Sequence, residues 1–263
     1  MKCVPDIPYD TSNGLMLDLY LPDRLNAKAC IIYAHGGGFR KGDRQDAAAA
    51  HFAERLTSAG FAMATVSYRL NTTLETFSEQ EQRYIASYVR RTSSIGFRLS
   101  PKLFGPAFIA ATEDVSRAIE FLWVEGSNLG ILSRKTGVLG ISAGGIAGLA
   151  LAFPPTHWQT QLVKPDTVVA VSAAIVQPWR LTEQAPPCLM LHGPDDRIIP
   201  LEAAQFGANR ARHVGAPVSL INTGVPGHAP QVDAILNGTS DASGTPVMDL
   251  ILERFEAMLE TEI

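Results

Sequence analysis

The residues best suited to chemistry lie around Ser142, in the segment GISAG at residues 140–144. An apolar run precedes this segment directly, and a helical pattern follows it. A serine on a sharp turn from a strand into a helix is the arrangement of a nucleophile elbow, which projects the hydroxyl group above a sheet. Gly140 and Gly144 lie where a side chain would collide as the helix folds back past the strand. The placement predicts a nucleophilic serine; the alternative is an ordinary glycine-rich turn.

A second glycine-rich segment, HGGGF at residues 35–39, follows the apolar run CIIYA. Attack on an acyl group produces a tetrahedral oxyanion, which needs N–H donors. Glycines let backbone amides approach a ligand closely, so we expect the amides of Gly37, Gly38 and Ala143 to form an oxyanion hole. His35 is better suited to fixing this loop by hydrogen bonding than to acting as a base. Neither phosphate-binding pattern, GxGxxG or GxxxxGK[ST], fits these glycines.

A nucleophilic serine needs a base, and the base needs a carboxylate that orients it. After a nucleophile elbow the chain order is serine, acid, histidine. His228 is the expected base because it lies in the loop GVPGHAP just beyond a strand, whereas a charged or capping role at a helix end suffices for His213. Asp195 and Asp196, in HGPDDRIIP, both follow a buried strand. Either aspartate could be the acid, and both could merely shape a turn.

Continuous apolar runs and helical patterns alternate along the chain. Residues 15–22 alternate as a half-buried strand does. The continuous runs predict strands at residues 29–34, 61–68, 137–141, 167–175, 188–191 and 218–221. Helical patterns cover residues 47–59, 107–124, 145–153, 201–214 and 248–259. Strands buried on both faces and alternating with helices predict an α/β fold with a mainly parallel sheet flanked by helices.

The composition favours one domain over the whole chain. It has 263 residues, of which 46 % are hydrophobic and 18 % charged, so it can build a large core. The net charge of −4 argues against nucleic-acid binding. The nearest basic cluster, Arg90 and Arg91 with Arg83 and Arg98, is interleaved with Glu79 and Glu81, as on a solvated helix face. Three cysteines, an odd number without pair spacing, indicate neither a disulfide framework nor a zinc site. The start lacks an apolar signal core, and no apolar run could span a membrane, so we expect a cytoplasmic protein.

Residues 71–105 interrupt the rhythm of strands and helices. This connection is too long for an ordinary loop, and residues 74–91 have helical spacing. The connection carries the aromatic residues Phe77, Tyr84, Tyr88, Phe97 and Phe104. Because it leaves the carboxyl end of a strand, we expect an insertion that covers the site as a lid. An insertion packed on the outer surface, or into the contact of a homodimer, is the alternative. The candidate substrate-binding residues are Phe39, Phe77, Tyr84 and Tyr88.

At these motifs the sequence resembles the α/β-hydrolase carboxylesterases, including the hormone-sensitive-lipase-like and small bacterial esterases. The segments that carry the resemblance are LDLYLP at 17–22, HGGGF at 35–39 with RKGD after it, YRL at 68–70, GISAGG at 140–145 and the HGxxDxxxP spacing at 192–200. The resemblance implies that Asp196 is the acid and that Gly37 and Gly38 serve the oxyanion hole. It departs from the family at residues 71–105, and at His228, which Ala-Pro follows in place of an aromatic residue.

The resemblance implies an esterase that hydrolyses a small or medium-sized ester through Ser142, His228 and Asp196, without a metal or an organic cofactor. The same triad would serve an amide-directed hydrolase such as an arylformamidase. A ligand-binding receptor built on this fold would usually lack a triad member, and here all three are present.

Overall fold

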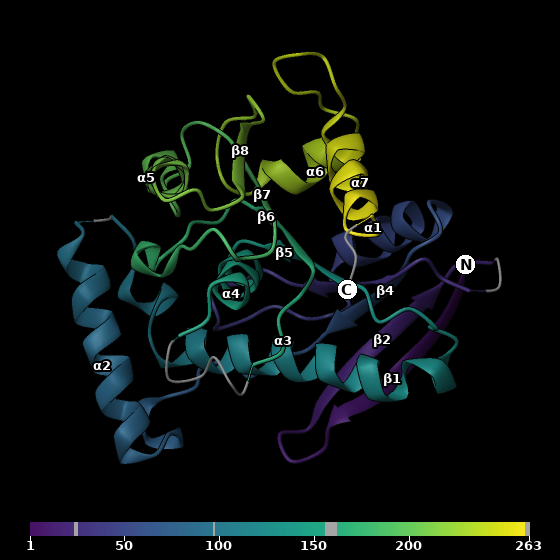
Figure 1. Cartoon of the computed structure of the whole chain (residues 1–263), viewed down its shortest axis with the longest axis horizontal. Helices are drawn as coiled ribbons and strands as arrows, with labels where there is room; N and C mark the ends of the chain where they lie inside the picture. Colours follow the sequence, from purple (N-terminus) through teal and green to yellow (C-terminus); the bar gives the residue numbers. More distant parts are fainter. Residues whose placement is uncertain (24–25, 97, 156–161, 261–263) are drawn as a thin grey trace.

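The apolar runs form the centre of one sheet. The structure, a computed structural model, describes residues 1–23, 26–96, 98–155 and 162–260. In these ranges one eight-stranded sheet has the order β1-β2-β4-β3-β5-β6-β7-β8 (Figure 1). Its strands are β1 (Lys2–Asp10), β2 (Leu15–Leu21), β3 (Cys30–Ala34), β4 (Ala62–Val66), β5 (Thr136–Ile141), β6 (Thr167–Val171), β7 (Cys188–His192) and β8 (Val218–Asn222). β1 and β2 run antiparallel to their neighbours, and all other pairs are parallel, so the predicted mainly parallel sheet is confirmed.

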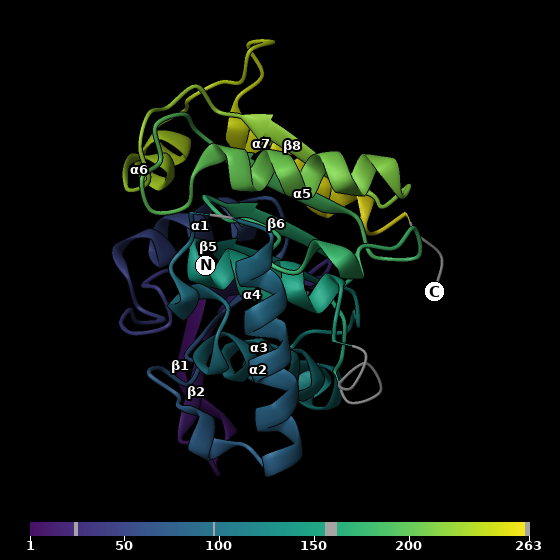
Figure 2. The ribbon, with the colours of Figure 1, turned by 90° about the vertical axis from the view of Figure 1, so that its left-hand side faces the viewer.

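Helices cover both faces of the sheet. The α-helices in the described ranges are α1 (Ala47–Ser58), α2 (Glu79–Ser94), α3 (Pro106–Glu125), α4 (Ala143–Ala152), α5 (Leu201–His213), α6 (Pro230–Leu236) and α7 (Val247–Ala257). Short 3₁₀ helices are η1 (Leu74–Thr76), η2 (Pro101–Leu103), η3 (Gly126–Leu129) and η4 (Pro178–Arg180). α3, α4 and α5 pack in one core, and α1, α6 and α7 pack in the other (Figures 1 and 2). No described helix is both long and apolar enough to cross a bilayer.

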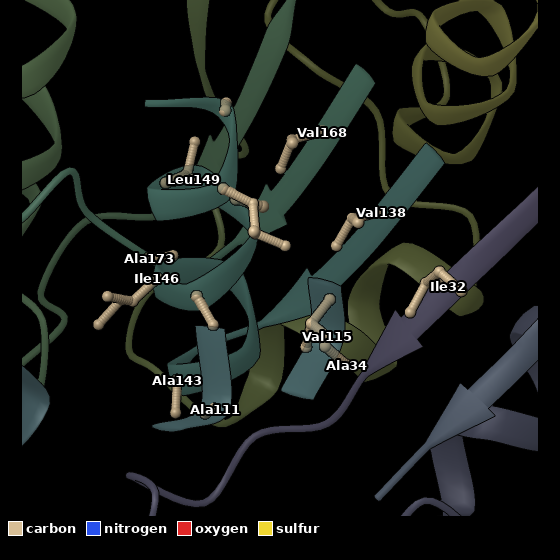
Figure 3. Close-up of a cluster of buried hydrophobic side chains, with 14 of the residues drawn as sticks. Ile32, Ala34, Ala111, Val115, Val138, Ala143, Ile146, Leu149, Val168 and Ala173 are labelled. Carbon is tan, nitrogen blue, oxygen red and sulfur yellow. The ribbon is translucent and has the colours of Figure 1, made fainter. Parts of the chain in front are cut away.

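The alternation of side chains along β3 shows why the central strands are apolar throughout. Ile32 faces the core that contains α3 and α4, while Ile31 and Tyr33 face the core that contains α1 and α7. In Figure 3, Ile32 and Ala34 lie with side chains of β5, β6, α3 and α4. Because neither face of these strands meets water, both sets of alternate positions must be apolar.

The sequence did not predict one strand, β1, or one α-helix, α6. A third element, the strand predicted for residues 167–175, is shorter than expected. β1 is an edge strand that contains Pro5 and Pro8, residues that weaken a strand pattern and are tolerated at a sheet edge. α6 spans only seven residues, too short for a clear periodic pattern. The strand predicted for residues 167–175 ends at Val171, because the chain turns at Ser172 with φ of 50°.

The 71–105 segment is partly helical, as expected, but its helix begins later than predicted. Ser78 caps α2 in a capping box with Glu81, which starts the helix at Glu79. η1 precedes α2 and η2 follows it. Phe104 is buried in the core that contains α3 and α4, whereas Phe97 lies outside the described residues.

Side chains of α2 dock the helix onto η4 and the residues before it. The Thr92 hydroxyl donates a hydrogen bond to the Val176 carbonyl at 3.1 Å. The guanidinium of Arg91 lies 4.4 Å from the ring centroid of Trp179, and that of Arg180 lies 4.4 Å from the ring centroid of Tyr88. These two cation–π contacts hold α2 against η4.

Candidate active site

Ser142 lies on the sharp turn between β5 and α4. Its backbone has φ of 52° and ψ of −112°, a conformation that a residue with a side chain rarely adopts. The collision expected at the flanking glycines is confirmed: a Cβ atom at Gly140 would lie 2.5 Å from the Gly144 backbone, and one at Gly144 would lie 2.1 Å from the Ala34 carbonyl oxygen. The Ser142 hydroxyl makes no capping hydrogen bond to α4. The turn therefore leaves this hydroxyl available to another partner.

Three loops at the carboxyl ends of parallel strands bring Ser142, His228 and Asp196 together. His228 Nε2 lies 2.9 Å from Ser142 Oγ, and His228 Nδ1 lies 2.6 Å from Asp196 Oδ2. The loops follow β5, β7 and β8. His213, the alternative base, is exposed in the last turn of α5. In this arrangement Asp196 can accept a hydrogen bond from the Nδ1–H of His228, which leaves Nε2 free to take a proton from the serine.

The carboxylate of Asp196 is held by several donors. Its Oδ1 accepts hydrogen bonds from the amides of Ile198 at 2.8 Å and Ile199 at 2.9 Å. Burial would raise the pKa of this carboxyl, but hydrogen bonds from His192, His228 and the two amides outweigh burial and hold the pKa well below its usual range. The neighbouring Asp195 is exposed and has a positive φ of 57°. The geometry thus joins Asp196, and not Asp195, to the histidine.

Two buried residues that the sequence reasoning gave no role support the histidine and the acid. His192 Nε2 lies 2.8 Å from the Ile199 carbonyl and 3.3 Å from Asp196 Oδ2. Gln231 is fully buried and donates to the carbonyls of Val225 and Gly227 in the loop that carries His228. The HGxxDxxxP spacing, which through the resemblance favoured Asp196, also contains His192. Gln231 follows His228 by three residues, with no pattern that marks it.

The HGGGF loop turns sharply beside Ser142. Gly37 and Gly38 have φ of 119° and 65°, and a Cβ atom at Gly37 would lie 1.8 Å from the Lys41 carbonyl oxygen. Both glycines line the same cavity as Ser142 and His228. Ala143 is the first residue of α4, where backbone amides have no partner within the helix. The three expected oxyanion-hole residues therefore belong to segments that adjoin Ser142.

His35 stabilises the HGGGF loop through hydrogen bonds and ring stacking. It is buried, and burial lowers the pKa of its imidazole. Nδ1 donates to the Gly36 carbonyl at 2.7 Å, and the ring stacks on Tyr68 with a centroid distance of 4.2 Å. The Tyr68 hydroxyl donates to the His35 carbonyl at 2.7 Å. These contacts agree with the expected loop-fixing role.

Ser142 and His228 open into a cavity of about 1030 Å³. The described residues that line it are Gly37, Gly38, Arg40, Lys41, Asn71, Arg98, Ser100, Lys102, Leu103, Ser142, Arg197, Ile198 and His228. A second cavity of about 590 Å³ shares Gly38, Arg40, Asn71 and Lys102 with the first. Its wall is more apolar and includes Leu74, Ile85 and Val89.

The structure does not support the four predicted substrate contacts. Phe39 is fully buried, and its ring packs against Tyr68 and Phe108. Phe77 is buried in the core that contains α3 and α4, and Tyr84 and Tyr88 pack against that core. None of Phe39, Phe77, Tyr84 and Tyr88 lines either cavity in the described part of the chain. Aromatic rings bury much apolar area, and here the core takes up that area, so contact of these four residues with a substrate stays a prediction.

Comparison with solved structures decides the fold. A truncated carbohydrate esterase from gut microbiota matches with a TM-score of 0.69 over 99 % of this chain and 97 % of its own, at 16 % identity. The chain has the α/β-hydrolase fold. An acetyl ester-xyloside bifunctional hydrolase from Caldicellulosiruptor lactoaceticus matches with a TM-score of 0.63 over 98 % and 96 %, at 18 % identity. A thermophilic esterase from Thermogutta terrifontis matches with a TM-score of 0.65 over 98 % and 91 %, at 15 % identity.

The sequence comparisons match a smaller part of the chain than the structural comparisons do. The model of the BD-FAE family, an esterase-type α/β-hydrolase family, matches residues 17–91. No curated protein matches the sequence. The resemblance to esterases of this fold, first indicated by the motifs, is confirmed by the family model and by the structures.

Proposed function

We propose that this α/β-hydrolase cleaves carboxylic esters through an acyl-enzyme intermediate. The observation that carries the proposal is the hydrogen-bonded chain from Ser142 Oγ through His228 to Asp196, at 2.9 and 2.6 Å, facing a cavity of about 1030 Å³. A cavity of this size suits a small or medium-sized ester. The similar structures include esterases and an acetyl ester-xyloside hydrolase, which agrees with this reaction class.

In the first half of the proposed reaction, Ser142 Oγ forms a bond to the acyl carbon while His228 Nε2 takes the hydroxyl proton. The amides of Gly37, Gly38 and Ala143 stabilise the negative oxygen of the tetrahedral intermediate. When the intermediate collapses, the ester C–O bond breaks and the imidazolium of His228 protonates the departing alcohol. Asp196 holds the imidazole tautomer and stabilises its cation.

In the second half, water attacks the acyl-serine and gives its proton to His228. The serine then leaves with that proton, and the carboxylic acid is released. Each step uses water and groups of this chain.

We infer further that residues 71–105 form a cap on a single α/β-hydrolase domain. Asn71, Arg98, Ser100, Lys102 and Leu103 of this segment line the cavity that contains Ser142. Residues of α2 line the adjoining cavity. The cap would therefore supply a wall of the substrate site through its polar and aliphatic residues, not through the aromatic residues first expected.

Replacing Ser142 by alanine tests the function. Ser142→Ala should abolish hydrolysis of p-nitrophenyl esters, assayed from acetate to palmitate, because no other group supplies the nucleophile. Adding His228→Ala should cost little further rate, since triad members act as a unit. Ser93→Ala, on the exposed part of α2, is the matched control and should keep the wild-type rate.

Two further measurements separate the alternatives. A fluorophosphonate probe should label the wild-type protein and not Ser142→Ala; an unlabelled, folded wild-type protein would instead indicate a ligand-binding receptor. Aryl formamides assayed beside the esters would reveal an amide-directed hydrolase if they were the better substrates. Full esterase activity in purified Ser142→Ala would disprove the assignment of the nucleophile.

A further inference from the structure

The cavity at Ser142 is lined by cations and by no carboxylate among the described residues. The cationic lining residues are Arg40, Lys41, Arg98, Lys102 and Arg197, and we call these five the basic rim. The chain as a whole has a net charge of −4. A protein with more acidic than basic residues thus concentrates positive charge at one place, the entrance to its serine.

The basic rim has no carboxylate partners in the part of the chain that the structure describes. Among the described residues no carboxylate lies within 4.0 Å of any of the five cations, whereas Arg44, Arg69 and Arg117 elsewhere each pair with acidic side chains. All five side chains of the basic rim are exposed. Their charges therefore act on whatever enters the cavity instead of being neutralised by the fold.

Three separate segments contribute to the basic rim. Arg40 and Lys41 follow the oxyanion-hole glycines, and Arg197 follows Asp196. Arg98 and Lys102 come from the cap segment on either side of Ser100. Because these residues come from different loops and line one cavity, their charges add up in the field that acts on an anion inside it. Like charges gathered in a cleft with low-dielectric walls focus the field and raise the local concentration of an oppositely charged substrate.

We propose that the substrate of this esterase carries a second, anionic group, such as a carboxylate, sulfate or phosphate, which binds the basic rim while Ser142 attacks the ester. This inference rests on the proposed function. The anionic group would accept hydrogen bonds from guanidinium and ammonium donors. The ester carbonyl of the same molecule would lie at Gly37 and Gly38. Neutral esters would lack the charge-assisted contacts and bind more weakly.

Paired substrates of matched shape test the proposal on both sides of the ester bond. For the acyl side, mono-p-nitrophenyl adipate is compared with its neutral methyl ester, p-nitrophenyl methyl adipate. For the alcohol side, 3-carboxy-4-nitrophenyl acetate is compared with its neutral methyl ester, 3-methoxycarbonyl-4-nitrophenyl acetate. The measured quantity is the ratio of kcat/KM for the anionic ester to kcat/KM for the neutral ester. At low ionic strength we expect a ratio of about ten or more in at least one pair.

Salt and substitution should both lower this ratio. Raising NaCl from about 20 mM to about 500 mM should reduce it at least about threefold, because screening weakens exposed charges. The triple variant Arg98→Gln/Lys102→Gln/Arg197→Gln should reduce it about tenfold, mainly through a higher KM for the anionic ester. The single variants, measured in parallel, should each reduce it by less. Arg134→Gln is the matched control. This exposed residue lies just before β5, at the end of that strand opposite Ser142.

The ratio of kcat/KM distinguishes failure of this proposal from failure of the esterase function. A ratio near or below one in both pairs, or a ratio that the triple variant leaves unchanged in a folded state, would overturn the proposal while leaving the esterase function intact. Equal losses for anionic and neutral esters would also overturn it, because they would indicate that the cations assist the oxyanion and not a second group. If neither ester of either pair is hydrolysed, the proposed function itself fails, and this inference with it.

Discussion

Ser142 holds a backbone conformation, φ of 52° and ψ of −112°, that costs free energy in a residue with a Cβ atom. Glycine accepts positive φ at no steric cost. We therefore expect Ser142→Gly to have a free energy of unfolding about 1 kcal/mol above that of Ser142→Ala, although both should be inactive. Urea denaturation measures the difference.

The matched comparison for this strain is Ser93→Gly against Ser93→Ala in α2. There the backbone is helical, so glycine should be the less stable of the two. The same sign at both positions would argue against strain at Ser142.

Asp196 and Asp195 are adjacent in sequence but differ in what they contact. Asp196→Asn should lower kcat by roughly 10⁴, the loss known for the equivalent change in a serine protease, because the amide no longer selects the imidazole tautomer. Asp195→Asn should keep most activity, since Asp195 is exposed and asparagine tolerates its φ of 57°. Steady-state kinetics on a p-nitrophenyl ester compares the two, and an inactive Asp195→Asn beside an active Asp196→Asn would move the acid by one residue.

The lowered pKa of Asp196 also has a consequence for stability. A carboxyl whose pKa is lower in the folded state than in the unfolded chain stabilises the fold above its unfolded pKa of about 3.9. That contribution is lost as the pH falls through the unfolded and then the folded value. It is therefore present in full at neutral pH.

At the scale of elements, α2 forms part of the wall of the more apolar cavity, the one of about 590 Å³. Ile85, Ala86 and Val89 of this helix line that cavity. If the cavity receives the longer part of an ester, Ala86→Phe should fill it and lower the octanoate-to-butyrate ratio of kcat/KM about tenfold, since each methylene in such a pocket is worth about 1–3 kcal/mol. The p-nitrophenyl ester series measures this ratio.

Ser93→Phe is the control for this prediction, because Ser93 is exposed on the same helix and does not line the cavity. It should leave the ratio unchanged. An equal ratio in Ala86→Phe and wild type would mean that substrates do not enter the apolar cavity.

At the scale of the whole molecule, a buried ionic network joins the antiparallel edge of the sheet to α3. Asp114 is fully buried; it accepts from the Arg69 amide at 2.7 Å and from Arg69 Nε at 2.9 Å, and it pairs with Arg117 at 3.0 Å. Arg117 also pairs with Asp10 at the end of β1. Removing one member of such a network leaves buried charge without a partner.

We expect Asp114→Ala to lower the free energy of unfolding by about 3 kcal/mol or more, measured by urea denaturation. Glu79→Ala is the matched control. It breaks the exposed pair with Arg83, which should change the free energy of unfolding by less than about 1 kcal/mol. A similar small loss in both variants would show that the network contributes little.

The sequence by itself determined the features that depend on local geometry. The turn around Ser142 needs Gly140 and Gly144 wherever a strand folds sharply into a helix, so its spacing marks the site without any distant contact. Strands buried on both faces must be apolar throughout, which identified the parallel core of the sheet. β1 was not predicted because an edge strand need not be apolar on both faces and has no turn of fixed glycine spacing. Its two prolines are also more typical of a loop.

Only the tertiary structure decided which residues at the site face which neighbours. From the residues alone, Asp195 and Asp196 were equivalent, and the resemblance favoured one; the fold buries Asp196 against His228 and leaves Asp195 in solvent. Phe39 and Phe77 lie in the core and not in the cavity. The basic rim is assembled from residues up to 157 positions apart, from Arg40 to Arg197. Burial and proximity between distant segments depend on how the layers pack, and no local pattern carries that information.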